Sequence, residues 1–368
     1  MHFLGLEPYL AARTNVSPSR LLQGGENYVI DVDGITFRTN SLIHAGEISA
    51  RGTAIFEAVP APPEHPTPAK SMSVDVPPRV VVKMSWHTPE AHYEDQLLRL
   101  AAERGVAGVA RLYCSAVGPC VSEGFRSRLV PDVMYANREL RIQVIGPLAR
   151  PLHEISEFKT FKAAFKSLVK SAFHFICGHS HYASNNIHPV HHDLFEKTGV
   201  LHRDISPGNL MVDASKPTQG VLIDLDFAAR VDVHGNPSEG GTFPHAGTLQ
   251  FRAFKLVTLE KPPKAYYRHD LESFFYALLW IQNHYEDGKR IDSPEASRYD
   301  FEFNGSWEST QSNKHGFLLC WDLPIAELSP TSLRDQWLTP MRRLFGEALD
   351  METDAAISHK EGRGELMD

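Results

Sequence analysis

The fold is decided by the stretch LHRDISPGNLMV, residues 201–212. Within it, Asp204 and Asn209 are five residues apart on a Pro-Gly turn between two apolar runs. This spacing places a carboxylate and an amide on one tight loop. Such a pair suits phosphoryl transfer, in which a carboxylate accepts the proton of the attacking hydroxyl and an amide oxygen binds a magnesium ion.

A second carboxylate follows in VLIDLDFA, residues 221–228, at the end of a short apolar run. Asp224 lies fifteen residues after Asn209. Magnesium in proteins binds one or two carboxylates and takes its other ligands from substrate phosphates and water. We therefore predict that Asn209 and Asp224 are the magnesium ligands and that ATP completes the site.

These two stretches together resemble the catalytic and magnesium-binding loops of eukaryotic protein kinases. The sequences HRDIS at 202–206, IDLD at 223–226 and HDLESFFY at 269–276 are most similar to the fungal-type protein kinase family. The resemblance covers roughly residues 40–320. It implies an α+β, bilobal protein kinase-like fold, with a small β-rich N-lobe and a larger α-helical C-lobe.

The resemblance also implies a function. We expect an ATP-dependent enzyme that transfers the γ-phosphate to serine or threonine hydroxyls of a protein substrate, with ATP and Mg²⁺ as cofactors. In this reading Asp204 is the catalytic base. Two alternatives stay open: a small-molecule phosphotransferase similar to choline or aminoglycoside kinases, and a catalytically silent pseudokinase that acts as a scaffold.

The nucleotide lysine is expected in a β-branched run, RVVVKMS at residues 79–85, which predicts an interior strand. Lys83 would contact the ATP phosphates. Kinases orient this lysine through an ion pair with a helical glutamate, and we favour Glu94, at the start of a leucine-rich helix eleven residues later. The rival acids are Glu90, Asp95 and Glu103.

A phosphate-covering loop is predicted at residues 49–58, where Gly52 and Thr53 would bind the nucleotide. Protein kinases carry several glycines there, because backbone amides must approach the phosphates closely. This chain offers Gly52 with only Gly46 upstream. The alternative is that Gly52 is an ordinary hairpin glycine.

Three more site residues take their roles from the resemblance. Thr248, in GTLQFRAFK at 247–255, is implied to lie beside Asp204, which favours hydroxyl substrates of the serine and threonine type. Arg203 directly precedes the base. Ser206 stands where most serine/threonine kinases carry a lysine that neutralises the transferred phosphate.

Two other positions depart from the kinase pattern. Asp226 replaces the glycine of the magnesium loop, as also happens in choline-kinase-like enzymes. Lys255 replaces the acid that normally closes the activation segment by pairing with an arginine of the large lobe, so that pairing must be lost or reversed. Together with Ser206, these departures are the reason for keeping the two alternatives.

Arg203 also motivates a regulatory hypothesis. An arginine beside the base is typically neutralised by an acid or a phosphate on the activation segment. We expect phosphorylation of Thr242, with Ser238 as the second choice. Glu239 is the alternative, a permanent charge that would make the enzyme constitutively active.

Apolar periodicity predicts the scaffold around these loops. Residues 140–145 read as the last N-lobe strand, followed by a hinge at Gly146-Pro147. Residues 158–177 have a helical apolar pattern, and residues 270–281 are apolar on nearly all faces, which predicts a buried helix. Asp270 would begin that helix, where the resemblance implies that it accepts hydrogen bonds from the catalytic loop.

Several histidines cluster shortly before the catalytic loop, and a metal site is one alternative for them. Zinc sites favour defined spacings with cysteines or acids alongside, whereas Asn185, Asn186 and Pro189 are typical of a surface loop. We therefore predict an inserted surface loop without a metal. The histidines are His174, His179, His181, His188, His191 and His192.

Composition narrows the functional classes. A formal net charge of −8 over 368 residues argues against a nucleic-acid partner, which needs a basic face. The four cysteines have neither metal-ligand spacing nor a disulfide-dense pattern, so we expect an intracellular protein of the cytoplasm or nucleus. The longest apolar run, residues 274–281, is too short for a bilayer, and we expect no membrane contact.

The domain organisation follows from these assignments. Asp33-Gly34 lies between two β-branched runs and predicts a peripheral hairpin. Seven prolines from Pro60 to Pro78 predict an exposed insertion, because proline lacks a donor for a sheet ladder. The expected segments are an N-terminal extension at 1–40, the N-lobe at 41–146 with the Pro-rich insertion at 60–79, the C-lobe at 147–350, and a flexible tail at 351–368.

Overall fold

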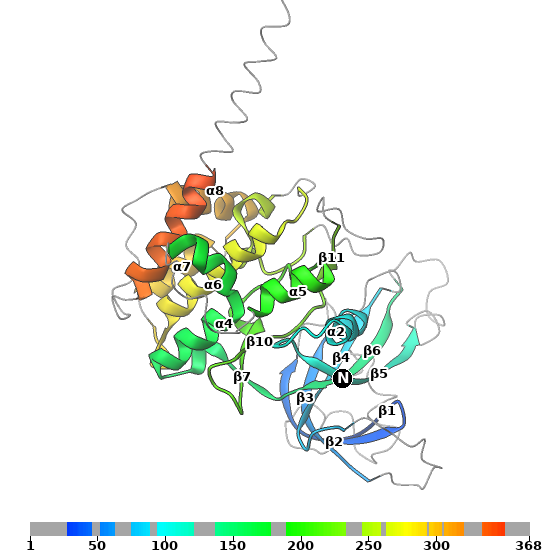
Figure 1. The fold of residues 1–368 in the computed structure, drawn as a ribbon. Coiled ribbons are helices and arrows are strands. Elements are labelled where there is room, and N and C mark those ends of the chain that lie inside the picture. Colours follow the sequence, from blue (N-terminus) through cyan, green and yellow to red (C-terminus); the bar gives the residue numbers. More distant parts are fainter. Residues whose placement is uncertain are drawn as a thin grey trace, which may run out of the picture. The chain divides into compact units, whose positions relative to one another are not determined.

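The computed structural model places the chain in two compact units (Figure 1). Unit 1 is Met1–Gly105, Val109–Ala149 and Asp213–Ser215, and unit 2 is Val106–Gly108, Arg150–Val212 and Lys216–Asp368. The structure describes residues 28–45, 52–62, 75–88, 94–120, 137–177, 189–232, 245–258, 263–292, 294–303, 305–319 and 333–349.

Unit 1 is built on an antiparallel sheet of six strands in the order β1-β2-β3-β4-β6-β5. The strands are β1 (Val29–Val32), β2 (Ile35–Ala45), β3 (Ala54–Pro60), β4 (Val80–His87), β5 (Arg111–Cys120) and β6 (Glu139–Gly146). β4 pairs with β3 on one side and β6 on the other, so the predicted interior strand is confirmed. The predicted strand at 140–145 is confirmed as β6.

The Asp33-Gly34 hairpin is also confirmed, with Val32 opposite Ile35 in the register. Both turn residues have positive φ, 52° and 80°, as a type I′ turn requires. The hairpin is at the periphery of the sheet but is part of it. β1 forms an edge of the six-stranded sheet, and β2 runs continuously from residue 35 to residue 45.

The predicted phosphate-covering loop is shorter than expected. Its second half is wrong as a loop, because β3 begins at Ala54 and pairs with β4. Gly52 and Thr53 lie immediately before the strand, whereas residues 49–51 and Gly46 lie outside the described residues. The β-branched and aromatic residues Ile55 and Phe56 favour the strand.

Helix α2 (Glu94–Glu103) belongs to the same unit. Leu97, Leu98 and Ala101 are buried along one face, as the leucine spacing predicts. Its first two residues, Glu94 and Asp95, are acidic and buried. Carboxylates in the first turn are favoured there by the helix dipole.

Unit 2 is mainly helical. Its helices are α4 (Phe158–Cys177), α5 (Val190–Thr198), α6 (Tyr267–His284), α7 (Pro294–Phe303) and α8 (Trp307–Leu319), and residues 333–349 are helical with a π-helical turn at Arg334–Leu338. The predicted helix at 158–177 is confirmed. The buried helix is confirmed as α6, but it begins at Tyr267, so Asp270 lies in its first turn and does not begin it.

Helix α6 is the core of unit 2, because Phe274 to Leu279 are all buried. Phe274 packs edge-on against Phe165 of α4, with ring centroids 6.1 Å apart. Phe165 in turn lies 5.6 Å from the Trp337 ring. The helix is therefore a rigid base for the loops that contact its first turn.

Short strands and turns frame those loops. β7 (Ala149–Pro151), β9 (Leu210–Asp213) and β10 (Gly220–Leu222) form a three-stranded sheet in the order β10-β9-β7, and β8 (Val200–Leu201) pairs with β11 (Ala229–Arg230). Three 3-10 turns accompany them: η4 (Pro207–Asn209), η5 (Leu249–Phe251) and η6 (Phe254–Leu256). None of the helices in the described ranges has the length and apolar character to cross a membrane.

Candidate active site

The loop predicted to be catalytic, residues 202–209 and called the catalytic loop below, lies in unit 2 between β8 and β9 and contains η4. Leu201, Ile205 and Leu210 are buried on either side of its polar residues. Pro207 occupies the first turn of η4, where its fixed φ suits a helical start. The loop is thus anchored by its apolar residues, and its polar side chains are held in place.

Asp270 in α6 binds the backbone of this loop. Its carboxylate accepts hydrogen bonds from the backbone nitrogens of His202 at 2.8 Å and Arg203 at 2.9 Å. Burial would raise the pKa of Asp270, but the hydrogen bond and charge of His191, followed by the charge and backbone hydrogen bond of His202, lower it below its ordinary value. Arg203 has a positive φ of 64°, a strained conformation for a non-glycine residue that these bonds stabilise.

His191 corrects the sequence reading of the histidine cluster. The sequence predicts an inserted surface loop for it, but it lies in α5, is fully buried, and places Nε2 2.9 Å from Asp270 Oδ2. Residues 178–188 lie outside the described residues. The signal for the helix was present, because Val190 and Leu194 have helical spacing and Gly199 ends the helix with φ 69°.

Asp204 accepts hydrogen bonds from Thr248, in another segment of unit 2, and from Asn209 on its own loop. Thr248 donates its backbone nitrogen at 2.9 Å and its hydroxyl at 3.1 Å, both to Oδ1. Asn209 Nδ2 lies 2.8 Å from the Asp204 carbonyl oxygen and 3.4 Å from Oδ2. The structure thus brings together three residues that the sequence assigned to the site.

The pKa of Asp204 is raised above its ordinary value. Burial is the largest cause, followed by the negative charge of Asp224, whereas the two hydrogen bonds from Thr248 act in the opposite direction. A raised pKa makes the carboxylate a stronger base. The Asp204 carboxylate is therefore both held in a fixed position and more basic than an ordinary aspartate.

Gly247 lets the Thr248 backbone approach the loop. Its φ is 86°, and a Cβ atom there would lie 2.4 Å from the Arg203 carbonyl oxygen. Any side chain at this position would be strained and would also collide with backbone. The glycine of the Gly-Thr pair is therefore a geometric requirement for the Thr248–Asp204 contact.

Asn209 and Asp224 lie at the same end of the β9–β10 hairpin. Leu210 opposes Leu222 in the register, and the Ile223 nitrogen donates to the Asn209 carbonyl oxygen at 3.3 Å. Because the Asn209 amide nitrogen donates to Asp204, the amide oxygen is the atom that could hold a metal ion. A carboxylate and an amide oxygen are ligands that Mg²⁺ prefers, so the donor set fits this ion.

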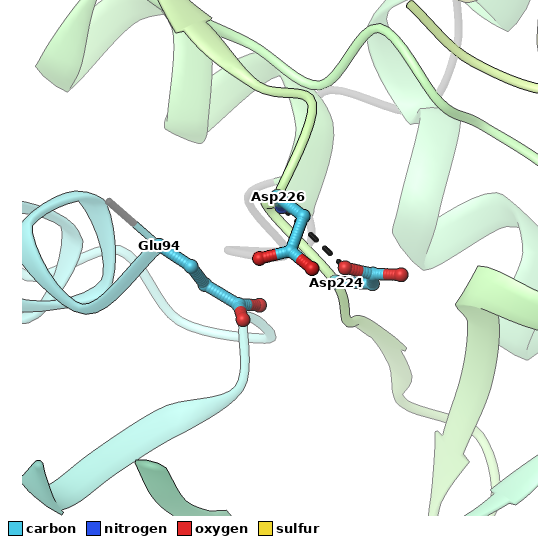
Figure 2. Close-up of side chains that lie close together, drawn as sticks. All are labelled: Glu94, Asp224 and Asp226. Atoms are coloured by element: carbon cyan, nitrogen blue, oxygen red, sulfur yellow. Dashed lines mark hydrogen bonds between the residues drawn. The ribbon is translucent and has the colours of Figure 1, made fainter. Parts of the chain in front are cut away.

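Asp226 lies on the same turn as Asp224. Its backbone nitrogen donates to Asp224 Oδ1 at 3.4 Å (Figure 2). Asp224 has a positive φ of 64°, another strained position at the site. The Asp226 side chain is buried, so this departure from the kinase pattern adds a third acidic side chain near the catalytic loop, after Asp204 and Asp224.

Lys83 and Glu94 form a buried ion pair in unit 1. Lys83 Nζ lies 2.7 Å from Glu94 Oε2, and their side chains are only 4% and 0% exposed. Glu94 projects from the first residue of α2 (Figure 2). The other acid at this helix start, Asp95, instead accepts a hydrogen bond from Ser115 at 3.1 Å. An ammonium held this way can bind phosphate oxygens.

The other predicted residues are placed as follows. Gly52 and Thr53 precede β3, in which Ile55 pairs with Lys83 of the neighbouring strand. Ser206 is buried at the start of η4. Burial lowers the pKa of the Arg203 guanidinium, an effect that the charge of Asp270 opposes. Thr242, Ser238, Glu239 and Glu90 lie outside the described residues.

One solved structure that matches this chain is that of vaccinia related kinase 3. The match has a TM-score of 0.46 and 15% sequence identity, and it covers 94% of this chain and 95% of that chain. A search of curated protein sequences gave no match.

The model of the fungal protein kinase family matches residues 4–118 and 185–282, more than half of the chain. The matched ranges include every site residue discussed above. Membership of a protein kinase family implies a phosphotransferase that uses ATP with a divalent metal and has a protein as its substrate. The chain belongs to the fungal protein kinase family.

Proposed function

We propose that this protein is an active kinase that transfers the γ-phosphate of ATP to serine or threonine hydroxyls of a protein substrate. One observation carries the proposal. Asp204 is held by two hydrogen bonds from Thr248 on one oxygen, within a loop fixed by Asp270. Rigid placement of a basic carboxylate is what proton abstraction from a hydroxyl requires.

Each residue has a role in this proposal. Asp204 accepts the proton of the attacking hydroxyl. Asn209 and Asp224 hold the magnesium ion, and Lys83, oriented by Glu94, binds the nucleotide phosphates. When bound, Mg-ATP supplies the transferable phosphoryl group and neutralises part of its charge. Gly52 and Thr53 are the proposed backbone contacts to the phosphates.

Ser206 sets a limit on charge stabilisation. Its hydroxyl is too short to reach a γ-phosphate in the way a lysine does. Neutralisation of the transferred group therefore falls to Lys83 and to the magnesium ion that Asn209 and Asp224 would hold. A serine here also occurs in kinases of small molecules, so the test must offer both substrate types.

The test is a radiolabelled-ATP assay with generic proteins, such as casein, and with small alcohols, such as choline. Wild-type protein should label serine and threonine of the proteins in a magnesium-dependent reaction. Asp204→Asn should abolish transfer while keeping ATP binding, and Asp224→Ala should remove magnesium-dependent binding. Glu286→Gln, an exposed carboxylate in β12 (Tyr285–Glu286), is the control and should behave as wild type.

Two results would refute the proposal. Labelling of the alcohol alone would show a small-molecule kinase. A wild-type protein without any magnesium-dependent thermal shift in ATP would show a scaffold without catalysis. Phosphoamino-acid analysis of the labelled protein decides between serine or threonine and tyrosine.

A further inference from the structure

Lys314 is a fully buried lysine in α8 of unit 2. Its Nζ lies 3.6 Å from the centroid of the Tyr276 ring and donates a hydrogen bond to the Arg252 carbonyl oxygen. Burial lowers the pKa of Lys314 to about 7, although the charge of Glu272 acts in the opposite direction. A lysine is rarely buried without a partner, because desolvation of its charge is costly.

Glu272 in α6 is the buried acid of the same region. Its Oε1 accepts the Phe254 backbone nitrogen at 2.7 Å and the Tyr276 hydroxyl at 3.1 Å. Burial raises the pKa of Glu272, and the hydrogen bond from Phe254 and the charge of Lys314 oppose this rise. Glu272 and Lys314 therefore both contact Tyr276, and the charge of each shifts the pKa of the other.

The two buried side chains bind the backbone of one short segment. Lys314 binds the carbonyl of Arg252, and Glu272 binds the amide of Phe254. The segment is continuous with η5, which follows Thr248 directly. It therefore leads within a few residues to the donor pair on Asp204.

The Arg252 side chain closes this segment on itself. Its Nη2 and Nε donate to the Gly247 carbonyl oxygen at 2.8 and 3.2 Å, and its guanidinium lies 4.7 Å from the Trp307 ring centroid. The position of Gly247 thus depends on Arg252, and the Arg252 backbone depends on Lys314. This is a continuous series of contacts from α8 to Asp204.

Lys255 directly follows this segment, in η6. An acid was expected at that position, paired with a distant arginine. Instead, the buried acid lies on α6 and the buried cation lies on α8, and each binds backbone of the segment before Lys255.

We propose that Lys314 is a positioning residue that, together with Glu272, holds residues 247–254 so that Thr248 meets Asp204. The inference deepens the proposed function and rests on it, because positioning matters for turnover only if Asp204 is the base. A merely structural role would lower stability and leave the turnover of the folded enzyme unchanged. A positioning role is therefore recognised by a fall in the turnover of the folded enzyme, which a purely structural role would leave unchanged.

The main test is Lys314→Met, which keeps length and removes the charge and the donor. We expect a fall in kcat of at least tenfold with KM for ATP changed less than twofold. Amide exchange of residues 245–258, measured by mass spectrometry, should rise at least tenfold, whereas exchange in β4 stays as in wild type. Lys166→Met is the matched control, since Lys166 is an exposed lysine that lies 5.7 Å from the Trp337 ring.

Glu272→Gln is the second variant if Lys314→Met does not fold, because it keeps the side-chain shape and an oxygen acceptor. Exchange over 245–258 should rise and kcat should fall, as expected for Lys314→Met. The inference is overturned if folded variants retain wild-type exchange in this segment and kcat within twofold. Should wild type transfer no phosphate at all, the proposed function fails, and the exchange data alone still decide whether Lys314 positions the segment.

Discussion

Thr248 donates two hydrogen bonds to one oxygen of Asp204, from its backbone nitrogen at 2.9 Å and its hydroxyl at 3.1 Å. The other oxygen, Oδ2, receives the longer 3.4 Å contact from Asn209. The two hydrogen bonds to Oδ1 therefore set the orientation of the Asp204 carboxylate. In the proposed mechanism, Oδ2 is the oxygen that accepts the substrate proton.

The hydroxyl of Thr248 can be tested separately from its backbone. Thr248→Ala removes one hydrogen bond to a charged group, worth about 1.5–3 kcal/mol, so kcat should fall about 10- to 100-fold. Thr248→Ser keeps the donor and should stay within about threefold of wild type. Steady-state kinetics with a protein substrate gives both values, and equal rates for the two variants would contradict the assignment.

Gly247 should not tolerate a side chain. Gly247→Ala places a methyl group 2.4 Å from the Arg203 carbonyl oxygen at φ 86°, so both thermal stability and activity should drop. Gly316→Ala is the control, because a Cβ atom there has no neighbour within 4 Å and the residue lies in α8. That control should gain about 0.5–1 kcal/mol of stability. Urea unfolding measures both, and a stable, active Gly247→Ala would refute the packing argument.

The Lys83–Glu94 pair should show strong coupling. Removing either partner leaves the other charge buried, which costs about 3–5 kcal/mol of unfolding free energy. Lys83→Met with Glu94→Leu should cost less than the sum of the single changes. The exposed pair Arg298–Glu302, 2.6 Å apart with side chains 47% and 25% exposed, is the comparison and should contribute less than about 1 kcal/mol. Additive single effects at the buried pair would contradict this expectation.

Lys314 should make stability depend on pH in the alkaline range. Its pKa is about 7 in the folded chain and near 10.5 when solvated, so between these values the unfolded state binds one more proton. The unfolding free energy should therefore rise with pH from 7 toward 10.5, by at most about 1.4 kcal/mol per pH unit from this group. As pH falls through this window, that contribution is lost.

The measurement is urea unfolding at pH 7, 8 and 9 for wild type and Lys314→Met. The difference between the two proteins isolates this lysine from other titrating groups. The wild-type curve should climb relative to the variant. Parallel curves over this range would show that Lys314 keeps its ordinary pKa.

Much of the fold was readable because local chemistry and packing agree. The Asp33-Gly34 turn, the interior strand at Lys83 and the helix at residues 158–177 each have a strong local signal. The same holds for the apolar helix that became α6, whose start was misplaced by three residues, from Tyr267 to Asp270. Helix ends depend on capping details, and here a tyrosine and a histidine form the cap, which propensity does not suggest.

The misses share a different cause. His191 was read from its polar neighbours as a surface residue, but its burial depends on Asp270, which lies 79 positions later. The Lys314 and Glu272 pair also joins two helices and a distant backbone segment, and neither residue has a local signature. Contacts of this kind arise from tertiary packing, which overrides local polarity.

In the β9–β10 hairpin, the distance along the sequence between Asn209 and Asp224 is independent of where the two residues lie in space. Asn209 and Asp224 lie at its open end, and the exposed residues 214–218 lie at its closed end. The separation of fifteen positions between these two proposed ligands is therefore a property of chain length, and the closed end can be lengthened without moving either residue. A reporter peptide inserted at the Pro217-Thr218 turn should therefore leave the positions of Asn209 and Asp224, and the activity that depends on them, unchanged.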